Sequence, residues 1–139
     1  MKPIVFLDTD VILDILLERD GFAPALQILQ MSADEDLTAC TSSLTMVDIV
    51  RVLTEQVPNA MLSTLQQMLS IIEILPVDGE QFETATLLSG HCFEANLQAA
   101  CAVRYNCTHI ATRRPNAYRI SAGELSSWHL PAIVTPEQL

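Results

Sequence analysis

Basic residues are scarce in this chain. Its 139 residues include a single lysine, Lys2, and six arginines, against 17 acidic residues, so that the net charge is −10. This balance argues against a protein that holds a polyanion on a broad basic surface, because such binding depends on many phosphate contacts. Any contact with nucleic acid must be local, and three of the arginines, Arg113, Arg114 and Arg119, lie within seven residues.

Long hydrophobic runs and paired cysteines are also missing. The N-terminal apolar run 4–7 is far too short for a signal peptide, and no run approaches the roughly 20 apolar residues of a membrane span. The four cysteines form no Cys-x-x-Cys pair and have no histidine at zinc-finger spacing, so we expect free thiols in a reducing compartment. These absences predict a cytoplasmic protein without a membrane partner.

Short apolar runs alternate with segments of helical periodicity. Half of the residues are hydrophobic but only 5% are aromatic, which is typical of helices packed on a buried sheet. Strands are expected at 4–7, 37–40, 71–77, 108–112 and 132–134, and helices at 11–18, 23–31, 44–53, 58–69, 81–88 and 93–104. This order predicts one α/β domain over residues 1–139, with a mostly parallel five-stranded sheet and helices on both faces.

The first expected strand ends on acids. Asp8 and Asp10 follow it directly, and ligands of open α/β sheets bind just outside the carboxyl ends of the strands. An aspartate at a strand-to-helix turn can instead cap the helix that follows. A cap needs one acid, whereas this turn supplies two, with Asp14 about one helical turn further on, and this favours a functional role.

Two more acids are candidates for the same site. Asp48 lies between apolar residues, where its helix should face the sheet, although it could also point to solvent. Carboxylates buried near each other need a cation or a shared proton, and a divalent ion is the usual solution. Glu94 begins the helix before the fourth strand, where an acid can also merely complement the helix dipole.

The fourth expected strand ends at Thr112, so its hydroxyl can reach the same edge of the sheet. Arg113, Arg114 and Arg119 follow in the next loop and are candidates for contacts with substrate phosphates. The alternative for these arginines is a solvated basic loop that balances the surrounding acidity.

Three segments taken together resemble the PIN-domain family: residues 4–14 (IVFLDTDVILD), 41–49 (TSSLTMVDI) and 108–113 (THIATR). Residues 130–139 also look like the closing strand of small bacterial PIN proteins, which include the toxins of toxin-antitoxin pairs. The resemblance implies a three-layer α/β/α fold. It further implies a ribonuclease in which three or four acids hold Mg²⁺ or Mn²⁺, which activates water against a phosphodiester.

In this resemblance Asp8 matches the family's first acid and Asp48 its second. Glu94 joins them as a candidate catalytic residue, and Asp10 joins them as a candidate metal ligand.

The chain departs from the family pattern at the other two acids. Ala95 stands where the third acid is expected, and Arg114 and Ala117 occupy the two usual places of the fourth. An arginine facing the site can repel Mg²⁺ or replace part of its charge. Two matching carboxylates, Asp8 and Asp48, with Asp10 and Glu94 as substitutes for the missing acids, would bind Mg²⁺ weakly. The reason is that this ion gives up its waters reluctantly.

Two functions follow from these observations. The first is a toxin-like, metal-dependent ribonuclease with an incomplete acidic site and weak activity. The second is a catalytically inactive PIN-fold module that binds RNA or a protein partner, such as an antitoxin. A homodimer is also expected, because the 58–69 helix carries more apolar residues than one core face requires, unless that helix is fully buried. These residues are Met61, Leu62, Leu65, Met68 and Leu69.

Two other families share part of the first motif. Asp8, Thr9 and Asp10 also look like the nucleophile motif of haloacid-dehalogenase-type phosphatases, and strand-end acids are found in phosphoacceptor receiver domains. Both families use a later lysine. The single lysine, Lys2, precedes the first strand, which argues against both.

Overall fold

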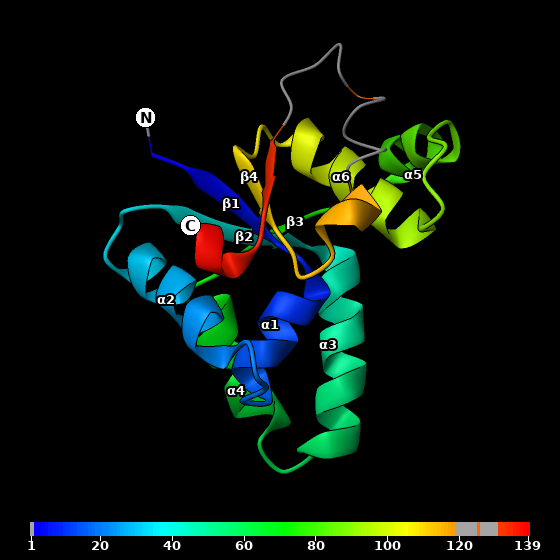
Figure 1. Cartoon of the computed structure of the whole chain (residues 1–139). Coiled ribbons are helices and arrows are strands. Elements are labelled where there is room, and N and C mark those ends of the chain that lie inside the picture. Colours follow the sequence, from blue (N-terminus) through cyan, green and yellow to red (C-terminus); the bar gives the residue numbers. More distant parts are fainter. Residues whose placement is uncertain (1, 119–124, 126–130) are drawn as a thin grey trace.

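The computed structural model describes residues 2–118, 125 and 131–139. Its centre is a five-stranded sheet in the order β3-β2-β1-β4-β5, with every neighbouring pair parallel (Figure 1). The strands are β1 (Ile4–Leu7), β2 (Thr38–Ser42), β3 (Glu73–Leu75), β4 (His109–Ala111) and β5 (Ala132–Val134). The helices are α1 (Thr9–Leu16), α2 (Phe22–Ala33), α3 (Ser43–Gln56), α4 (Met61–Leu69), α5 (Gly79–Thr86), α6 (Phe93–Arg104) and the 3-10 helix η1 (Pro136–Gln138). The expected α/β class is confirmed.

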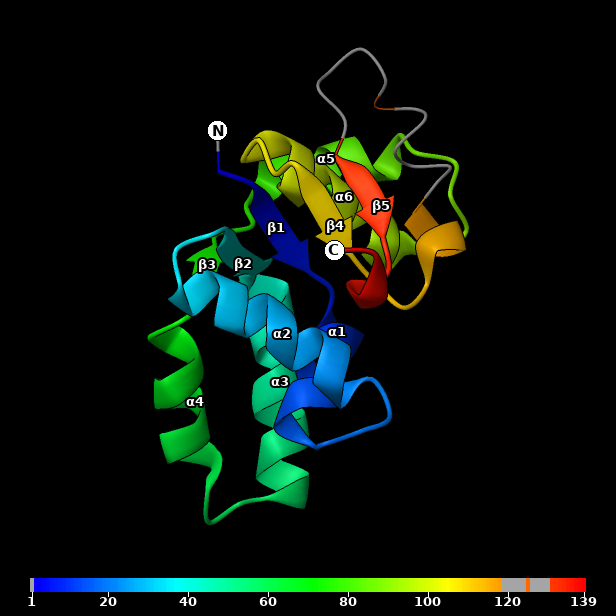
Figure 2. The same cartoon turned by 60° about the vertical axis from the view of Figure 1, so that its left-hand side comes forward.

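Helices cover both faces of the sheet, which gives three layers (Figures 1 and 2). Side chains alternate along β1, so that Val5 and Leu7 pack toward α1 to α4 while Phe6 packs toward α6. All three are fully buried, as expected for a central parallel strand that reads as a continuous hydrophobic run. The position of β1 between β2 and β4 puts its carboxyl end in the middle of the sheet edge.

The third strand and the fourth helix differ from the prediction. Strand β3 covers three residues rather than 71–77, because the N–H groups of Ile71 and Ile72 donate back to the carbonyl of Met68 and close helix α4. Helix α4 begins at Met61 rather than at Pro58, because a turn closed by the Ala60 N–H and the Val57 carbonyl precedes it.

The apolar residues of α4 are only partly exposed. Met68 is buried, and Met61 and Leu65 pack against the core, whereas Leu62 and Leu69 are 68% and 52% exposed. Within the residues that the structure describes, none of the helices combines the length and the apolar character needed to cross a membrane. The expected free thiols are confirmed, since none of the four cysteines forms a disulfide.

Candidate functional site

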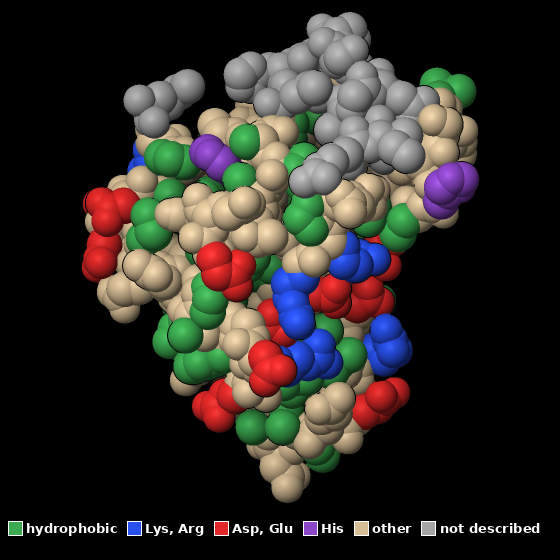
Figure 3. Space-filling model, viewed as in Figure 1, with side chains coloured by type: hydrophobic (Ala, Val, Ile, Leu, Met, Phe, Trp, Pro, Cys, Tyr) green, Lys and Arg blue, Asp and Glu red, His purple; other side chains and the backbone are tan. Residues whose placement is uncertain are grey.

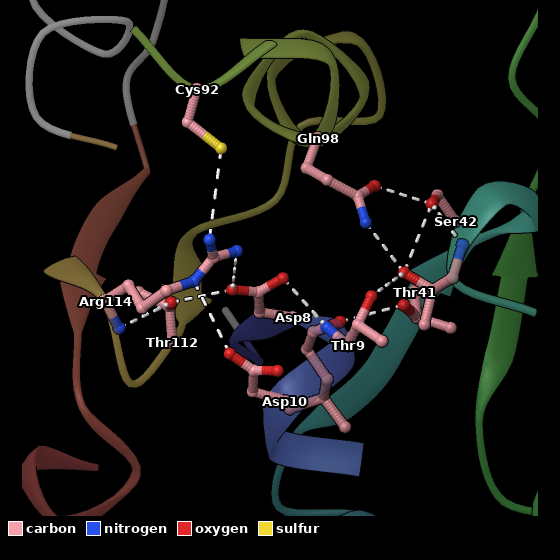
Figure 4. A network of polar contacts seen from close by, with 11 residues as sticks. Asp8, Thr9, Asp10, Thr41, Ser42, Cys92, Gln98, Thr112 and Arg114 are labelled. Atoms are coloured by element: carbon pink, nitrogen blue, oxygen red, sulfur yellow. Dashed lines mark hydrogen bonds and ion pairs between the residues drawn. The ribbon is translucent and has the colours of Figure 1, made fainter. Parts of the chain in front are cut away.

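Asp8 lies at the carboxyl end of β1 and is fully buried. Its Oδ1 accepts the Thr9 N–H at 2.8 Å and thereby caps helix α1. Its Oδ2 accepts the Thr112 hydroxyl at 2.8 Å, across 104 residues of chain (Figure 4). The capping role and the predicted position at the sheet edge are therefore both correct, and Thr112 reaches the edge as expected.

Arg114 supplies positive charge to this edge. Its guanidinium lies 3.5 Å from Asp8 Oδ2 and 3.4 Å from Asp10 Oδ2 (Figure 4). Its backbone N–H donates to the Thr112 hydroxyl at 3.0 Å, which fixes the start of the loop. Partial burial by itself lowers the pKa of Arg114, but the charges of Asp8 and Asp10 outweigh it and raise that pKa above its ordinary value. Two aspartates of the predicted metal site thus already share one cation.

Glu94 and Asp48 border the same site. Glu94 is exposed in the first turn of α6. Partial desolvation raises its pKa, and the charges of Asp8 and Asp48 raise it further, with Arg114 opposing. Asp48 is partly exposed and forms an ion pair with Arg51 at 3.3 Å, so the expectation that it faces the sheet is wrong. It lies at the border of the site, close enough to Glu94 for its charge to act on that residue.

The acids do not form a ready metal centre. Within the described part of the chain, no three carboxylate, imidazole or thiol groups converge closely enough to hold an ion. The expected ligand set of Asp8, Asp10 and Asp48 is therefore not assembled. Acidic and basic side chains lie next to each other on this face of the molecule, in place of a continuous basic surface (Figure 3).

Alanines stand at two of the positions where acids are expected. Ala95 is fully buried in the core beneath α6, and Ala117 packs against the same core. No carboxylate therefore projects from either position.

Arg113 has a different partner from Arg114. Its guanidinium lies 2.9 Å from Oδ1 of Asp14, which is fully buried in α1. The second oxygen, Asp14 Oδ2, has no hydrogen-bond partner among the described residues. Arg113 and Arg114 thus balance acidic side chains, as the alternative of a basic loop among acids expects, and each does so in an ion pair. Their predicted contacts with substrate phosphates stay a prediction. Arg119 lies outside the described residues, so its predicted contact stays a prediction.

A buried polar network beside Asp8 was not predicted from the sequence. Gln98 on α6 accepts from the Ser42 hydroxyl at 2.6 Å and donates to Thr45 Oγ1 at 2.7 Å, and Thr9 donates to the same Thr45 oxygen at 3.2 Å (Figure 4). The network joins α6, β2, α3 and α1. A glutamine in the apolar run of α6 was the available signal, because a buried amide needs partners.

The sequence matches the family model described as PIN domain over residues 4–114, and the chain belongs to that family. No curated protein matches the chain.

Several solved structures share the fold. FitAcB from Neisseria gonorrhoeae is 17% identical, with a TM-score of 0.68 and coverage of 97% of this chain and 99% of the other. A toxin-antitoxin complex from Klebsiella pneumoniae is 18% identical, with a TM-score of 0.66 and coverage of 95% and 97%. VapBC2 from Rickettsia felis, bound to a DNA fragment from its promoter, is 19% identical, with a TM-score of 0.61 and coverage of 84% and 92%.

Proposed function

We propose that this PIN-domain protein is a toxin-like ribonuclease that depends on Mg²⁺ or Mn²⁺ and has weak activity. One of the structures that share its fold is a toxin-antitoxin complex from Klebsiella pneumoniae, which supports the toxin-like type. The observation that carries the proposal is the position of Arg114, whose guanidinium contacts the two aspartates best placed to hold a metal. Metal must compete with this internal cation, and activity is weak for that reason.

The acids fit a divalent cation in kind and in charge. Carboxylate oxygens are the ligands that Mg²⁺ prefers. Four acids border the site, namely Asp8, Asp10, Asp48 and Glu94. Arg114 offsets only one of their negative charges. Since no three of the described groups converge, a bound ion would keep most of its waters and bind weakly.

Each residue of the site has a distinct part in this proposal. A bound divalent cation would activate water and stabilise charge on a phosphodiester. Asp8 and Asp10 would hold the ion, with Asp48 and Glu94 adding negative charge around it. The Thr112 hydroxyl fixes the orientation of the Asp8 carboxylate. Arg114, once displaced from the aspartates, is positioned to pair with a phosphate oxygen of RNA.

Partners are part of the same proposal. An antitoxin would be the protein partner of a toxin-like chain, and RNA its substrate. A homodimer would cover Leu62 and Leu69, the exposed apolar residues of α4.

The test is a calorimetric titration of Mn²⁺, followed by cleavage of a mixed RNA pool in the presence of Mn²⁺. We expect Asp8→Asn to lose metal binding and cleavage, because the amide lacks the ligand charge. Asp78→Asn is the matched control, since Asp78 caps α5 as Asp8 caps α1 but lies in another turn. Unchanged cleavage by Asp8→Asn would remove the proposed site.

The second candidate function is a non-catalytic binding module. The burial of Ala95 at an expected acid position favours it. In that case neither the wild type nor the Asp78→Asn control binds Mn²⁺ at millimolar concentration, while RNA association depends on Arg113 and Arg114 and weakens with salt.

A further inference from the structure

A half-buried ion pair ties Arg113 to the core. The guanidinium of Arg113 donates to Oδ1 of Asp14 at 2.9 Å, and the Asp14 side chain is fully buried whereas that of Arg113 is 46% exposed. The other carboxylate oxygen, Asp14 Oδ2, makes no hydrogen bond with the described residues. The contact of one carboxylate oxygen therefore joins helix α1 to the loop that follows β4.

Stability alone does not account for this ion pair. Burying a carboxylate is costly, and a buried ion pair often stabilises a fold no more than apolar residues of similar size would. Asp14 interrupts an apolar stretch of α1, in which Ile12 and Leu13 belong to the core. The carboxylate also has little room to turn, because a Cβ on Gly21 would overlap Asp14 Oδ2. Asp14 thus holds Arg113 in a fixed direction, as residues that support a functional side chain do.

Arg113 keeps donors for a second partner. A guanidinium carries several N–H donors in a planar fork, and the contact with Asp14 uses one of them. Because the side chain is nearly half exposed, other donors can reach a ligand in solvent. The fork matches the geometry of a phosphate group. Arg113 directly follows Thr112, whose hydroxyl donates to Asp8, so it lies beside the candidate site.

The charges around the two neighbouring arginines differ. Arg114 contacts both Asp8 and Asp10, so a phosphate that approaches Arg114 meets net negative charge. Arg113 and Asp14 form a neutral pair, and a phosphate that approaches its exposed side meets N–H donors without that excess of negative charge. The described contacts therefore favour Arg113 over Arg114 as the first residue to bind a phosphate.

We propose that Asp14 is a positioning residue, which holds Arg113 so that its guanidinium binds a backbone phosphate of single-stranded RNA at the acidic site. This inference rests on the RNA substrate of the proposed function, but it requires no metal ion. It gives a role to a buried acid that is not among the candidate metal ligands.

The test is the binding of labelled oligouridine at low salt and without divalent metal, measured by fluorescence anisotropy. Asp14→Ala should weaken binding about 5- to 10-fold, although it removes a negative charge, because Arg113 loses its anchor. Asp14→Asn should bind about as tightly as the wild type, since the amide oxygen can accept the same hydrogen bond. Asp36→Ala is the matched control. Asp36 is exposed in the segment before β2, and removing its charge should leave binding equal or slightly tighter.

A double variant tests whether Asp14 acts through Arg113. Arg113→Ala alone would leave the buried Asp14 carboxylate without its cation and destabilise the protein, whereas Asp14→Ala/Arg113→Ala leaves no such charge. The double variant should bind oligouridine little more weakly than Asp14→Ala does. Its salt dependence should be shallower than that of the wild type by about 0.7, the value for one phosphate contact with a single strand. Melting temperatures show whether each variant is folded.

Two results overturn the role of Asp14 and leave the RNA substrate in place. One is binding by folded Asp14→Ala as tight as that of the Asp36→Ala control, which would mean that Asp14 only balances charge. The other is a marked further loss in the double variant, which would mean that Arg113 reaches RNA without its anchor. A third result, no binding of oligouridine by the wild type, overturns both this inference and the RNA substrate of the proposed function.

Discussion

Replacing Arg114 with alanine is expected to increase the affinity of the protein for Mn²⁺. The guanidinium lies within 3.5 Å of both Asp8 and Asp10, so in the proposed metal site it would compete with an incoming ion for these carboxylates and repel it. Removing it frees two carboxylates and eliminates that repulsion. The direction of the effect is unusual, because loss of a site residue should here strengthen ligand binding.

The magnitude follows from the charges. Two unit charges about 4 Å apart interact by about 1 kcal/mol in water and by about 4 kcal/mol at an effective dielectric constant of about 20. The Arg114 side chain is 41% exposed, so solvent screening favours the lower value. Doubling that value for a divalent ion gives about 2 kcal/mol, which corresponds to about 30-fold tighter Mn²⁺ binding.

The assay is calorimetric titration of Mn²⁺ at fixed ionic strength, with melting temperatures recorded in parallel. Metal-free Arg114→Ala should melt at a lower temperature than the wild type, because the buried Asp8 loses its cationic partner. Saturating Mn²⁺ should raise its melting temperature more than it does for the wild type, in line with the tighter binding.

Arg104→Ala is the matched control. Arg104 forms an ion pair with Glu80 at 3.2 Å and is 47% exposed, but it lies at the far end of α6 from the acidic site. Its replacement should leave Mn²⁺ affinity unchanged. Equal or weaker Mn²⁺ binding by Arg114→Ala would refute the argument that Arg114 competes with metal.

Two further changes test the surroundings of the site. Gly21→Ala should destabilise the protein by about 1–3 kcal/mol in denaturant unfolding, because the added Cβ would overlap the buried Asp14 carboxylate; unchanged stability would show that Asp14 can move aside. Glu94→Gln should stabilise the protein at pH 7. The pKa of Glu94 is raised on folding, so its contribution to stability is present at low pH and is lost as pH rises through the folded pKa. The gain should disappear near pH 4, and an equal gain at both pH values would contradict the raised pKa of Glu94, which desolvation and the charge of Asp8 cause.

The parts of the site that could be predicted from sequence rest on local signals. An apolar run that stops on Asp8 places that residue at a strand end, and parallel strands bring Thr112 to the same edge. Helix α6 has the predicted bounds, 93–104, because Gly90 and the turn at Asn106 delimit it.

The contacts of the arginines could not be predicted, because they depend on tertiary structure. Arg113 pairs with an acid 99 residues earlier in the chain, and Arg114 with one 106 residues earlier. The sequence places Arg113 and Arg114 next to each other in one loop. In the structure they contact different aspartates, Asp14 and Asp8. Adjacent side chains in a loop diverge, and only the folded backbone fixes which acid each one reaches.

Helix α3 shows why the position of Asp48 was mispredicted. The apolar pattern assigned Val47 to the buried face, but Val47 is 67% exposed. The buried stripe runs through Thr45, Ile49 and Leu53 at intervals of four residues. Thr45 is polar, and it can be buried because Ser42 and Gln98 satisfy its hydrogen bonds. A pattern of hydrophobic residues does not indicate such hydrogen bonds.

The presence of Asp8 does not by itself indicate catalysis. Its Oδ1 caps α1 and its Oδ2 accepts from Thr112, and both contacts form without a metal. A PIN domain that had lost its nuclease activity would therefore still need this aspartate to join β1, α1 and β4. Arg114 supplies the positive charge that the buried carboxylate of Asp8 requires when no ion is bound. Metal affinity, rather than the aspartate itself, distinguishes a weak nuclease from a binding module, and the site has the contacts to keep its structure in either case.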